Sequence, residues 1–333
     1  MARAVILGCL GPSLTEPERR FFASTNPWGF ILFARNVETP EQLARLTAEL
    51  RAAVGREAPI LIDQEGGRVA RLRGPAWRDW APALEDCARL PATMRPGAMR
   101  LRYRLIAGEL AAVGIDVNCA PVLDLLHPET HAIIRDRCYG ADPEEVAVTG
   151  RAVAEGLLEG GVLPVIKHMP GQGRAPLDSH LELPVVTADV TTLARDFAPF
   201  RALRDLPLAM TAHVVYAALD PHAPATQSAS MVRLIREDLG FDGLLMTDDL
   251  SMRALHGSFA ERVHRAISAG CDVILHCNGN SAEAAETAEA APRLDGAALR
   301  RAEAALARRG AFAPADPEAL AAEFAALSGA VHA

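Results

Sequence analysis

Short apolar runs alternate along the chain with longer stretches in which apolar residues recur at helical spacing. The runs predict buried β-strands at 4–10, 29–33, 60–63, 115–121, 163–168, 208–213, 244–247 and 273–276. The longer stretches predict amphipathic helices at 39–53, 98–113, 143–159, 191–206, 229–239 and 259–269. Strands that are apolar along nearly their whole length are typical of a parallel sheet covered on both faces, because neither face meets water.

This alternation predicts an α/β fold, a single (β/α)8 barrel of the TIM type. About eight strands, each followed by a helix or a long loop, occur without an internal Ser/Gly linker. We expect one catalytic domain over 1–333, with an Ala/Glu/Arg-rich helical segment at about 280–333 packed on it. The alternative is a doubly wound open sheet, but no G-x-G-x-x-G motif leads from a strand into a helix.

Polar residues gather where the predicted strands end. They are Asp63, Asp124, Lys167, His168, His213, Asp248, Asp249 and His276. The loops at the C-terminal ends of barrel strands build the active site in this fold. We therefore expect the site at this end of the barrel.

Charge and cysteine content narrow the partners. A net charge of -8 without a Lys/Arg cluster argues against a nucleic acid. No segment approaches the roughly 18 apolar residues of a membrane helix, and too few residues precede Cys9 for a signal peptide. The six cysteines lack zinc-type spacing, so we expect buried free thiols, no bound metal and a soluble protein of the cytoplasm.

Lysine use singles out one position. Of the 34 basic residues, only Lys167 is a lysine. Arginine and lysine differ in shape, donor geometry and ability to lose a proton, so this position requires what a planar guanidinium does not provide. The alternative is that Lys167 is a surface residue that remained a lysine by chance, but it ends an apolar run beside His168.

The first motif with chemical content is DQEGGR at 63–68, directly after an apolar run. A strand-end carboxylate such as Asp63 can accept hydrogen bonds from sugar hydroxyls, and Arg71 is near enough along the chain to reach the same pocket. A tight turn with a charged surface is the alternative.

The second motif places Asp178 two residues before His180, in a loop that begins with Pro170 and Gly171. An Asp bound to one ring nitrogen of a His fixes its tautomer and raises its basicity, which suits proton transfer near neutral pH. An ordinary surface histidine is the alternative.

The third motif pairs Asp248 with Asp249 at the end of an apolar run. Adjacent strand residues point in opposite directions, so we expect only one carboxylate to face the barrel mouth. The other is expected to cap a helix or to bind backbone groups. The carboxylate that faces the mouth is a candidate nucleophile for a glycosyl centre.

Five motifs in order resemble those of family 3 glycoside hydrolases and, within that family, the β-N-acetylglucosaminidases of peptidoglycan recycling. They are DQEGGRV at 63–69, RDRCYG at 135–140, KHMPG at 167–171, DSH at 178–180 and TDDLSM at 247–252. The family commonly has His where Gln172 stands, and Ser-Phe where Cys138 and Tyr139 stand. These departures bear on loop dynamics and affinity more than on chemistry.

The resemblance implies a retaining exo-β-N-acetylglucosaminidase without a cofactor. Its substrates would be muropeptides or GlcNAc-1,6-anhydroMurNAc fragments, so the expected partner is a small-molecule sugar or muropeptide. It also implies that Asp248 is the nucleophile and that His180 with Asp178 forms the acid–base dyad. The implied sugar-binding residues are Asp63, Arg71, Arg137, Lys167 and His168.

Three alternatives stay open at this point. Lys167 is a candidate Schiff-base lysine of an aldolase or lyase, because a desolvated strand-end lysine can do that chemistry. A sugar-binding sensor without turnover would keep the same residues. Phosphorolysis in place of hydrolysis would suit a neutral histidine base, which tolerates phosphate as an acceptor better than a carboxylate does.

Overall fold

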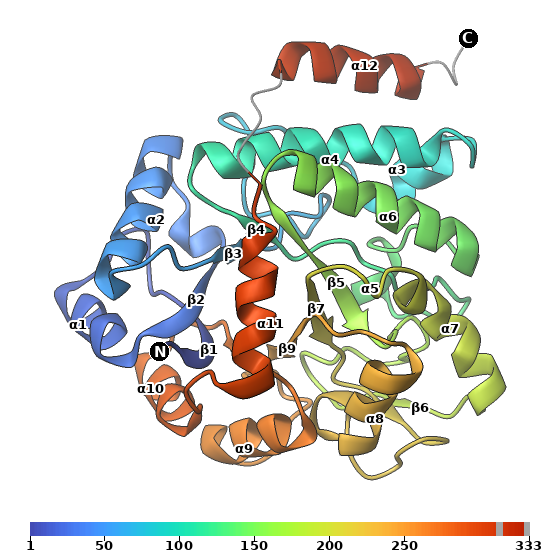
Figure 1. Cartoon of the computed structure of the whole chain (residues 1–333). Helices are drawn as coiled ribbons and strands as arrows, with labels where there is room; N and C mark the ends of the chain where they lie inside the picture. The colour runs from blue at the N-terminus through green and yellow to red at the C-terminus, as the bar shows by residue number, and fades with distance from the viewer. Residues whose placement is uncertain (311–315, 330–333) are drawn as a thin grey trace.

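The computed structural model describes residues 1–310 and 316–329 (Figure 1). Its parallel strands close into a barrel in the order β1-β10-β9-β7-β5-β4-β3-β2. Their bounds are β1 Arg3–Gly8, β2 Pro27–Leu32, β3 Ile60–Ile62, β4 Val117–Asn118, β5 Leu163–Met169, β7 Leu208–Thr211, β9 Leu244–Asp249 and β10 Val273–His276. The predicted (β/α)8 barrel is confirmed, and the open sheet is wrong, because β1 pairs with both β2 and β10.

The strand prediction is least accurate at β4. The apolar run covers 115–121, whereas β4 has only 2 residues. Pro121 has no N–H to donate to a neighbouring strand, so the ladder ends early. The chain nevertheless continues beside β5, because the N–H groups of Val165 and Lys167 donate to the carbonyls of Ala120 and Pro121.

The crossover helices lie where the periodicity predicts them. Their bounds are α2 Pro40–Val54, α4 Arg95–Ala112, α6 Pro143–Glu159, α7 Val190–Ala202, α8 Ala229–Arg233 and α9 Phe259–Ala269, with a π-helical turn η3 at Leu234–Asp238 after α8. Thr39, Asp142, Asp189 and Ser258 accept hydrogen bonds from first-turn N–H groups of α2, α6, α7 and α9. These caps satisfy donors that have no partner inside the helix.

Several short elements have no signal in the apolar pattern. They are α1 Glu16–Thr25, α3 Ala83–Arg89, α5 Ala132–Arg135, and the small parallel pair β6 Val185–Val186 and β8 Val215–Tyr216. In α1, the side chains of Thr15 and Glu18 form a capping box that marks the start of the helix.

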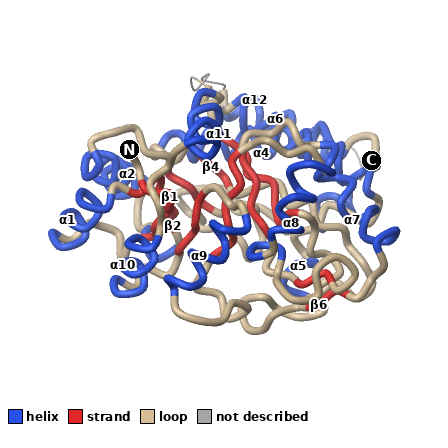
Figure 2. The backbone as a smooth tube through the Cα atoms, turned by 60° about the horizontal axis from the view of Figure 1, so that its bottom comes forward, coloured by secondary structure: helices blue, strands red, loops and turns tan. Residues whose placement is uncertain are grey.

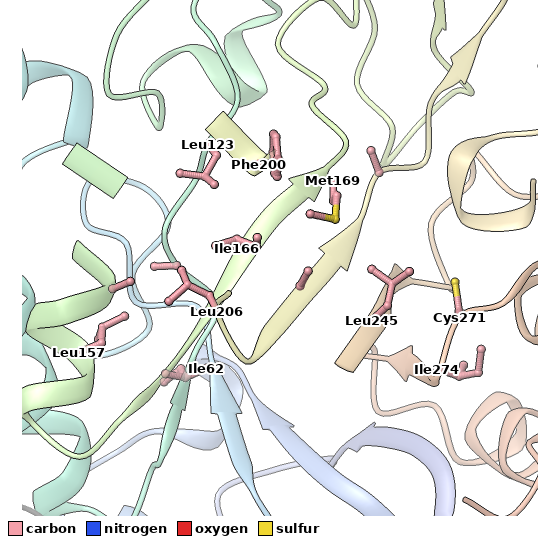
Figure 3. Close-up of a cluster of buried hydrophobic side chains, with 14 of the residues drawn as sticks. Ile62, Leu123, Leu157, Ile166, Met169, Phe200, Leu206, Leu245, Cys271 and Ile274 are labelled. Carbon is pink, nitrogen blue, oxygen red and sulfur yellow. The ribbon is translucent and has the colours of Figure 1, made fainter. Parts of the chain in front are cut away.

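Side-chain alternation along the strands separates two apolar layers. In β1, Ala4 and Ile6 belong to a cluster inside the barrel, whereas Val5 and Leu7 belong to the layer between the barrel and its helices. Figure 3 shows part of this outer layer. The barrel interior is therefore a packed core rather than a pore.

The helices near the C-terminus are α10 Ser281–Ala290, α11 Gly296–Ala307 and α12 Pro317–Gly329. In Figure 1, α11 lies across the barrel opening, and its Ala302 and Ala305 join the interior cluster. α12 runs alongside α4 (Figure 1). Residues 311–315 and 330–333 of the segment expected at about 280–333 lie outside the described residues. The assignment of the whole chain to one domain stays a prediction.

Two further expectations concern the cysteines and membrane-spanning helices. All six cysteines are buried free thiols, as expected. Burial raises the pKa of the Cys9, Cys87 and Cys271 thiols to about 12, so they stay protonated. None of the described helices is long and apolar enough to cross a membrane.

Candidate active site

A cavity of about 320 Å³ opens at the C-terminal ends of the barrel strands. In Figure 2 the long loops gather at this end of the barrel, opposite to α11. The strand-end residues that line the cavity are Asp63, Lys167, His168, Asp248 and Asp249. The other three predicted strand-end residues, Asp124, His213 and His276, are not among the lining residues. The structure thus brings most of the strand-end residues together.

We refer to Asp63, Lys167 and the buried Glu65 that pairs with Lys167 as the floor of the cavity. Lys167 Nζ lies 2.7 Å from Asp63 Oδ1 and 2.6 Å from Glu65 Oε1, and its side chain is 1 % exposed. Desolvation alone would lower the pKa of Lys167, but the two carboxylates outweigh it and raise the pKa above its ordinary value. Lys167 is therefore a fixed positive charge.

Two arginines extend the floor. Arg71 Nη2 lies 3.0 Å from Asp63 Oδ2. Arg137 binds Glu65 through two contacts, with Nε 2.9 Å from Oε2 and Nη2 2.8 Å from Oε1, a bidentate geometry that strengthens an ion pair. Desolvation works to raise the pKa of Glu65, but Arg137 and Lys167 lower it to about 2.

Glu65 is a site residue that the sequence analysis did not single out. It is buried and pairs with two cations that were singled out, Lys167 and Arg137. Its signal in the sequence is the second acid of the 63–69 motif, two residues after Asp63. In an extended segment such residues share a face.

His168 lies between Asp124 and Arg137. Its Nδ1 is 2.7 Å from Asp124 Oδ2, and its Nε2 is 3.2 Å from Arg137 Nη2. An arginine can only donate, so this network assigns the ring proton to Nδ1 and makes Nε2 an acceptor. Asp124 is fully buried and also accepts from the Gln172 N–H at 2.7 Å. It therefore connects His168 with the loop that follows β5.

Asp248 is half-buried at the end of β9 and opens onto the cavity. The Asp249 N–H donates to its Oδ1 at 2.8 Å. Desolvation works to raise the pKa of Asp248, but the nearby imidazoles of His213 and His168 and this hydrogen bond outweigh it, so the pKa lies below its ordinary value. The carboxylate is ionised at neutral pH, as nucleophilic attack requires.

Asp248 and Asp249 both line the cavity, so the expectation that only one faces the mouth is wrong. The register between β9 and β10 shifts between Val273 and Leu275, and strict alternation does not hold where a ladder is irregular. The two carboxylates still differ in their contacts. Asp249 accepts hydrogen bonds from the Ser251 N–H and hydroxyl and from the Cys277 N–H, whereas Asp248 keeps acceptor capacity for a ligand.

His180 and Asp178 lie on the loop 170–180 and pair directly. His180 Nδ1 is 2.7 Å from Asp178 Oδ1, and the His180 side chain is 56 % exposed. Desolvation works to raise the pKa of Asp178, but hydrogen bonds from the His180 backbone and ring lower it below its ordinary value. An ionised Asp178 fixes the ring orientation and leaves Nε2 of His180 available for proton transfer. His180 lines the cavity, whereas Asp178 is not among the lining residues.

His213 stabilises the end of β9 and is fully buried. Its Nδ1 lies 2.7 Å from Thr226 Oγ1, and its Nε2 lies 3.1 Å from the Asp249 carbonyl oxygen. Burial lowers the pKa of His213. His213 therefore positions the Asp248–Asp249 pair through the backbone.

Within residues 1–310 and 316–329, no group of three or more His, Cys, Asp or Glu side chains is arranged to hold a metal ion. The chemistry that this arrangement supports directly is nucleophilic attack by a carboxylate combined with proton transfer by an imidazole.

Residues 14–308 match the family described as "Glycosyl hydrolase family 3 N terminal domain". The chain belongs to glycoside hydrolase family 3. Among its curated relatives, the "Beta-hexosaminidase" of Alkalilimnicola ehrlichii is 40 % identical over 284 residues, covering 82 % of this chain and 80 % of the relative. The "Beta-hexosaminidase" of Methylococcus capsulatus is 38 % identical over 280 residues, covering 83 % of each chain.

Solved structures give the same assignment. Native NagZ from Neisseria gonorrhoeae superimposes with a TM-score of 0.84 at 32 % identity, covering 99 % of this chain and 97 % of that chain. NagZ from the same organism in complex with N-trifluoroacetyl-D-glucosamine gives a TM-score of 0.83 at 32 % identity with the same coverage. The chain is thus similar to β-N-acetylglucosaminidases over its whole barrel.

Proposed function

We propose that this chain is a retaining exo-β-N-acetylglucosaminidase. The observation that carries the proposal is that the Asp248 carboxylate and the Asp178-supported imidazole of His180 meet at one cavity. Membership of family 3 and the relatives named beta-hexosaminidase support the reaction class. The NagZ neighbour that holds N-trifluoroacetyl-D-glucosamine supports an N-acylated sugar as ligand.

In the first step, Asp248 attacks the anomeric carbon and the bond to the aglycone oxygen breaks. His180 donates its Nε2 proton to that oxygen, so the aglycone departs as a neutral alcohol. The product is a glycosyl ester on Asp248. Most retaining hydrolases use a second carboxylate as the acid. An imidazole titrates closer to neutral pH, which suits both donation and later removal of a proton.

In the second step, a water molecule attacks the same anomeric carbon. The imidazole of His180 accepts a proton from this water, the bond to Asp248 breaks, and the carboxylate is restored. Two inversions at one carbon retain the configuration of the substrate. The same histidine thus acts first as acid and then as base.

Five further residues are proposed to bind the sugar before the scissile bond: Asp63, Arg71, Arg137, Lys167 and His168. All five line the cavity. They are paired with one another or with Glu65, so their positions are fixed before a sugar arrives. Pre-organised polar groups of this kind stabilise a transition state without having to reorient.

The proposed natural substrates are cell-wall fragments with a terminal β-linked N-acetylglucosamine, including GlcNAc-1,6-anhydroMurNAc, in the cytoplasm. The five sequence motifs support this substrate class. The buried free cysteines are consistent with a reducing compartment.

Lys167 is poorly suited to the alternative Schiff-base chemistry. Attack on a carbonyl needs a neutral amine, whereas Lys167 lies between two carboxylates that raise its pKa. Borohydride treatment with a carbonyl substrate is therefore expected to leave Lys167 unmodified.

Turnover and stereochemistry test the proposal together. The enzyme is expected to hydrolyse a chromogenic β-N-acetylglucosaminide faster than the matching β-glucoside, and NMR is expected to detect the β-anomer first. First formation of the α-anomer would contradict the retaining mechanism. Binding of N-acetylglucosamine without turnover would indicate a sensor. Formation of a sugar 1-phosphate after addition of inorganic phosphate would indicate phosphorolysis.

A further inference from the structure

Gln172 is held at the cavity wall by contacts to its own backbone and to its neighbours. Its N–H donates to Asp124 at 2.7 Å. On either side, the Tyr216 hydroxyl donates to the Gly171 carbonyl at 2.8 Å, and the Thr130 hydroxyl donates to the Gly173 carbonyl at 2.7 Å. These anchors come from other parts of the barrel. The start of the loop 170–180 is therefore fixed, and with it the direction of the Gln172 side chain.

The carboxamide of Gln172 has no partner among the described residues, although the residue is only 4 % exposed. Its Oε1 is fully buried without a hydrogen bond. An unpaired buried polar group costs free energy, and native structures seldom keep one without a reason. Gln172 lines the cavity, and its Nε2 is not among the fully buried unpaired atoms, so a ligand in the cavity can reach the carboxamide from this side.

The other polar lining groups sharpen this contrast. Lys167, Arg137 and His168 each bind a protein partner. Gln172 contributes the only side-chain amide to the described cavity lining. An amide is neutral at every pH and offers one donor group and one acceptor. Its natural complement is a neutral group that also donates and accepts.

We propose that Gln172 binds the substrate directly, with its carboxamide paired to one neutral donor–acceptor group of the sugar. Both a hydroxyl and the acetamido group of N-acetylglucosamine have this chemistry. The inference rests on the proposed function in one respect, that the cavity receives a sugar. The proposed Gln172 contact does not depend on charge, whereas the contacts made by the floor of the cavity do.

A substitution at Gln172 separates binding from folding. Methionine has nearly the same shape but no hydrogen-bonding group. Gln172→Met removes an unpaired buried oxygen, so the thermal stability of the free enzyme should be unchanged or higher. Only the complex loses a hydrogen bond. A residue with a merely structural role would show the opposite pattern, a lower melting temperature with unchanged kinetics.

The matched control is Gln227, at the end of the 3-10 turn η2 Ala225–Gln227. Its Nε2 is also buried and unpaired among the described residues, but Gln227 does not line the cavity. Gln172→Met is expected to lower kcat/KM for the chromogenic β-N-acetylglucosaminide about tenfold or more. It should also reduce the melting-temperature shift produced by N-acetylglucosamine. Gln227→Met should leave both quantities unchanged.

Kinetics with the matching β-glucoside identify which group of the sugar Gln172 contacts. A loss confined to the N-acetylglucosaminide assigns the contact to the acetamido group, and an equal loss on both substrates assigns it to a hydroxyl. The proposal is overturned if folded Gln172→Met keeps kcat/KM within about twofold and keeps the wild-type ligand-induced shift. Gln172→Ala serves as the second variant if the methionine variant does not fold.

Failure of the proposed function gives a different result. If wild type binds N-acetylglucosamine without turnover, weaker binding by Gln172→Met in calorimetry still supports the contact while the hydrolase assignment fails. If wild type does not bind N-acetylglucosamine at all, both proposals are wrong.

Discussion

The floor of the cavity and the loop 170–180 hold their functional groups in opposite ways. In the floor, the side chains of Lys167 and Glu65 are 1 % and 3 % exposed and lie within ion-pair distance. On the loop, the His180 side chain is 56 % exposed. Apart from its pairing with Asp178, His180 accepts a hydrogen bond at its carbonyl from the Arg253 N–H. The floor holds charged groups that are buried and paired, whereas the loop holds the exposed imidazole for which we propose proton transfer.

Because the two regions differ in burial, substitutions in them are expected to affect stability and activity differently. A change in the floor removes part of a buried charge network and is expected to affect stability as well as activity. A change at the exposed end of the loop removes a proton-transfer group with few packing contacts, so it is expected to affect activity alone. Variants in the two regions and at Asp248 test this difference.

The largest effect is expected for Asp248→Asn. Loss of the nucleophile should lower kcat on the order of 10⁴-fold or more, as removal of a group that acts within a catalytic unit does. Binding of N-acetylglucosamine, followed by calorimetry, should persist because the sugar-binding residues are intact. Activity above one tenth of wild type, or loss of binding along with turnover, would contradict the assignment.

His180→Ala is expected to lower kcat/KM by about 10²- to 10⁴-fold, the range for a positioned acid–base group. The melting temperature should not change, because the side chain is exposed. The loss should be smaller for a phenol leaving group, which departs without protonation. His222 provides the control: it is exposed, it follows Asp220 at the same two-residue spacing, and its N–H donates to that Asp. His222→Ala should behave as wild type in every assay.

Glu65→Gln tests the floor through stability. Leaving Lys167 and Arg137 without this carboxylate should cost about 3–5 kcal/mol of unfolding free energy at pH 7, as breaking a buried ion pair does. The pKa of Glu65 is about 2 in the fold against 4.5 ordinarily. A lowered folded pKa gives stability that is present above the unfolded value and is lost as pH falls through the folded value. The difference from wild type should therefore narrow between pH 4.5 and 2.

Urea unfolding at several pH values measures this difference. The control is Glu16→Gln, because Glu16 lies on the surface beside Arg20 with 63 % of its side chain exposed. Such pairs contribute little, so this variant should match wild type throughout. A Glu65→Gln variant as stable as wild type at pH 7 would show that the floor is not a structural network.

The smallest effect is expected for Asp178→Asn. A hydrogen bond to a charged group contributes about 1.5–3 kcal/mol, so kcat/KM should fall by about 10- to 100-fold. The carboxylate orients the imidazole for proton transfer, so the fall should appear in kcat more than in KM. An unchanged kcat in the folded variant would mean that Asp178 does not assist His180.

The sequence predicts much of the barrel, because apolar runs and helical periods are local signals. Every barrel strand overlaps an apolar run, and the N-terminal caps lie at the predicted helix starts. Where local regularity fails, so does the prediction. Pro121 ends β4 early, and a register shift at the end of β9 turns both Asp248 and Asp249 toward the cavity.

Side-chain partners were harder to predict. The roles of Glu65 and Asp124 depend on which way each side chain points after its strand, and a single sequence does not encode that direction locally. Gln172 faces the cavity because Tyr216 and Thr130, 44 and 42 residues away, hold its neighbours. Only the folded barrel brings these contacts together.

The central claim is that Asp248 becomes covalently linked to the sugar. The most direct measurement is incubation with a mechanism-based fluorinated N-acetylglucosaminide, followed by digestion and mass spectrometry of the labelled peptide. We expect one label in the wild type, on Asp248. If departure of the leaving group needs the acid, His180→Ala should carry no label after the same incubation time, with no nucleophile wash in either sample. Label on Asp249 or on another residue, or turnover without any covalent species, would contradict the account.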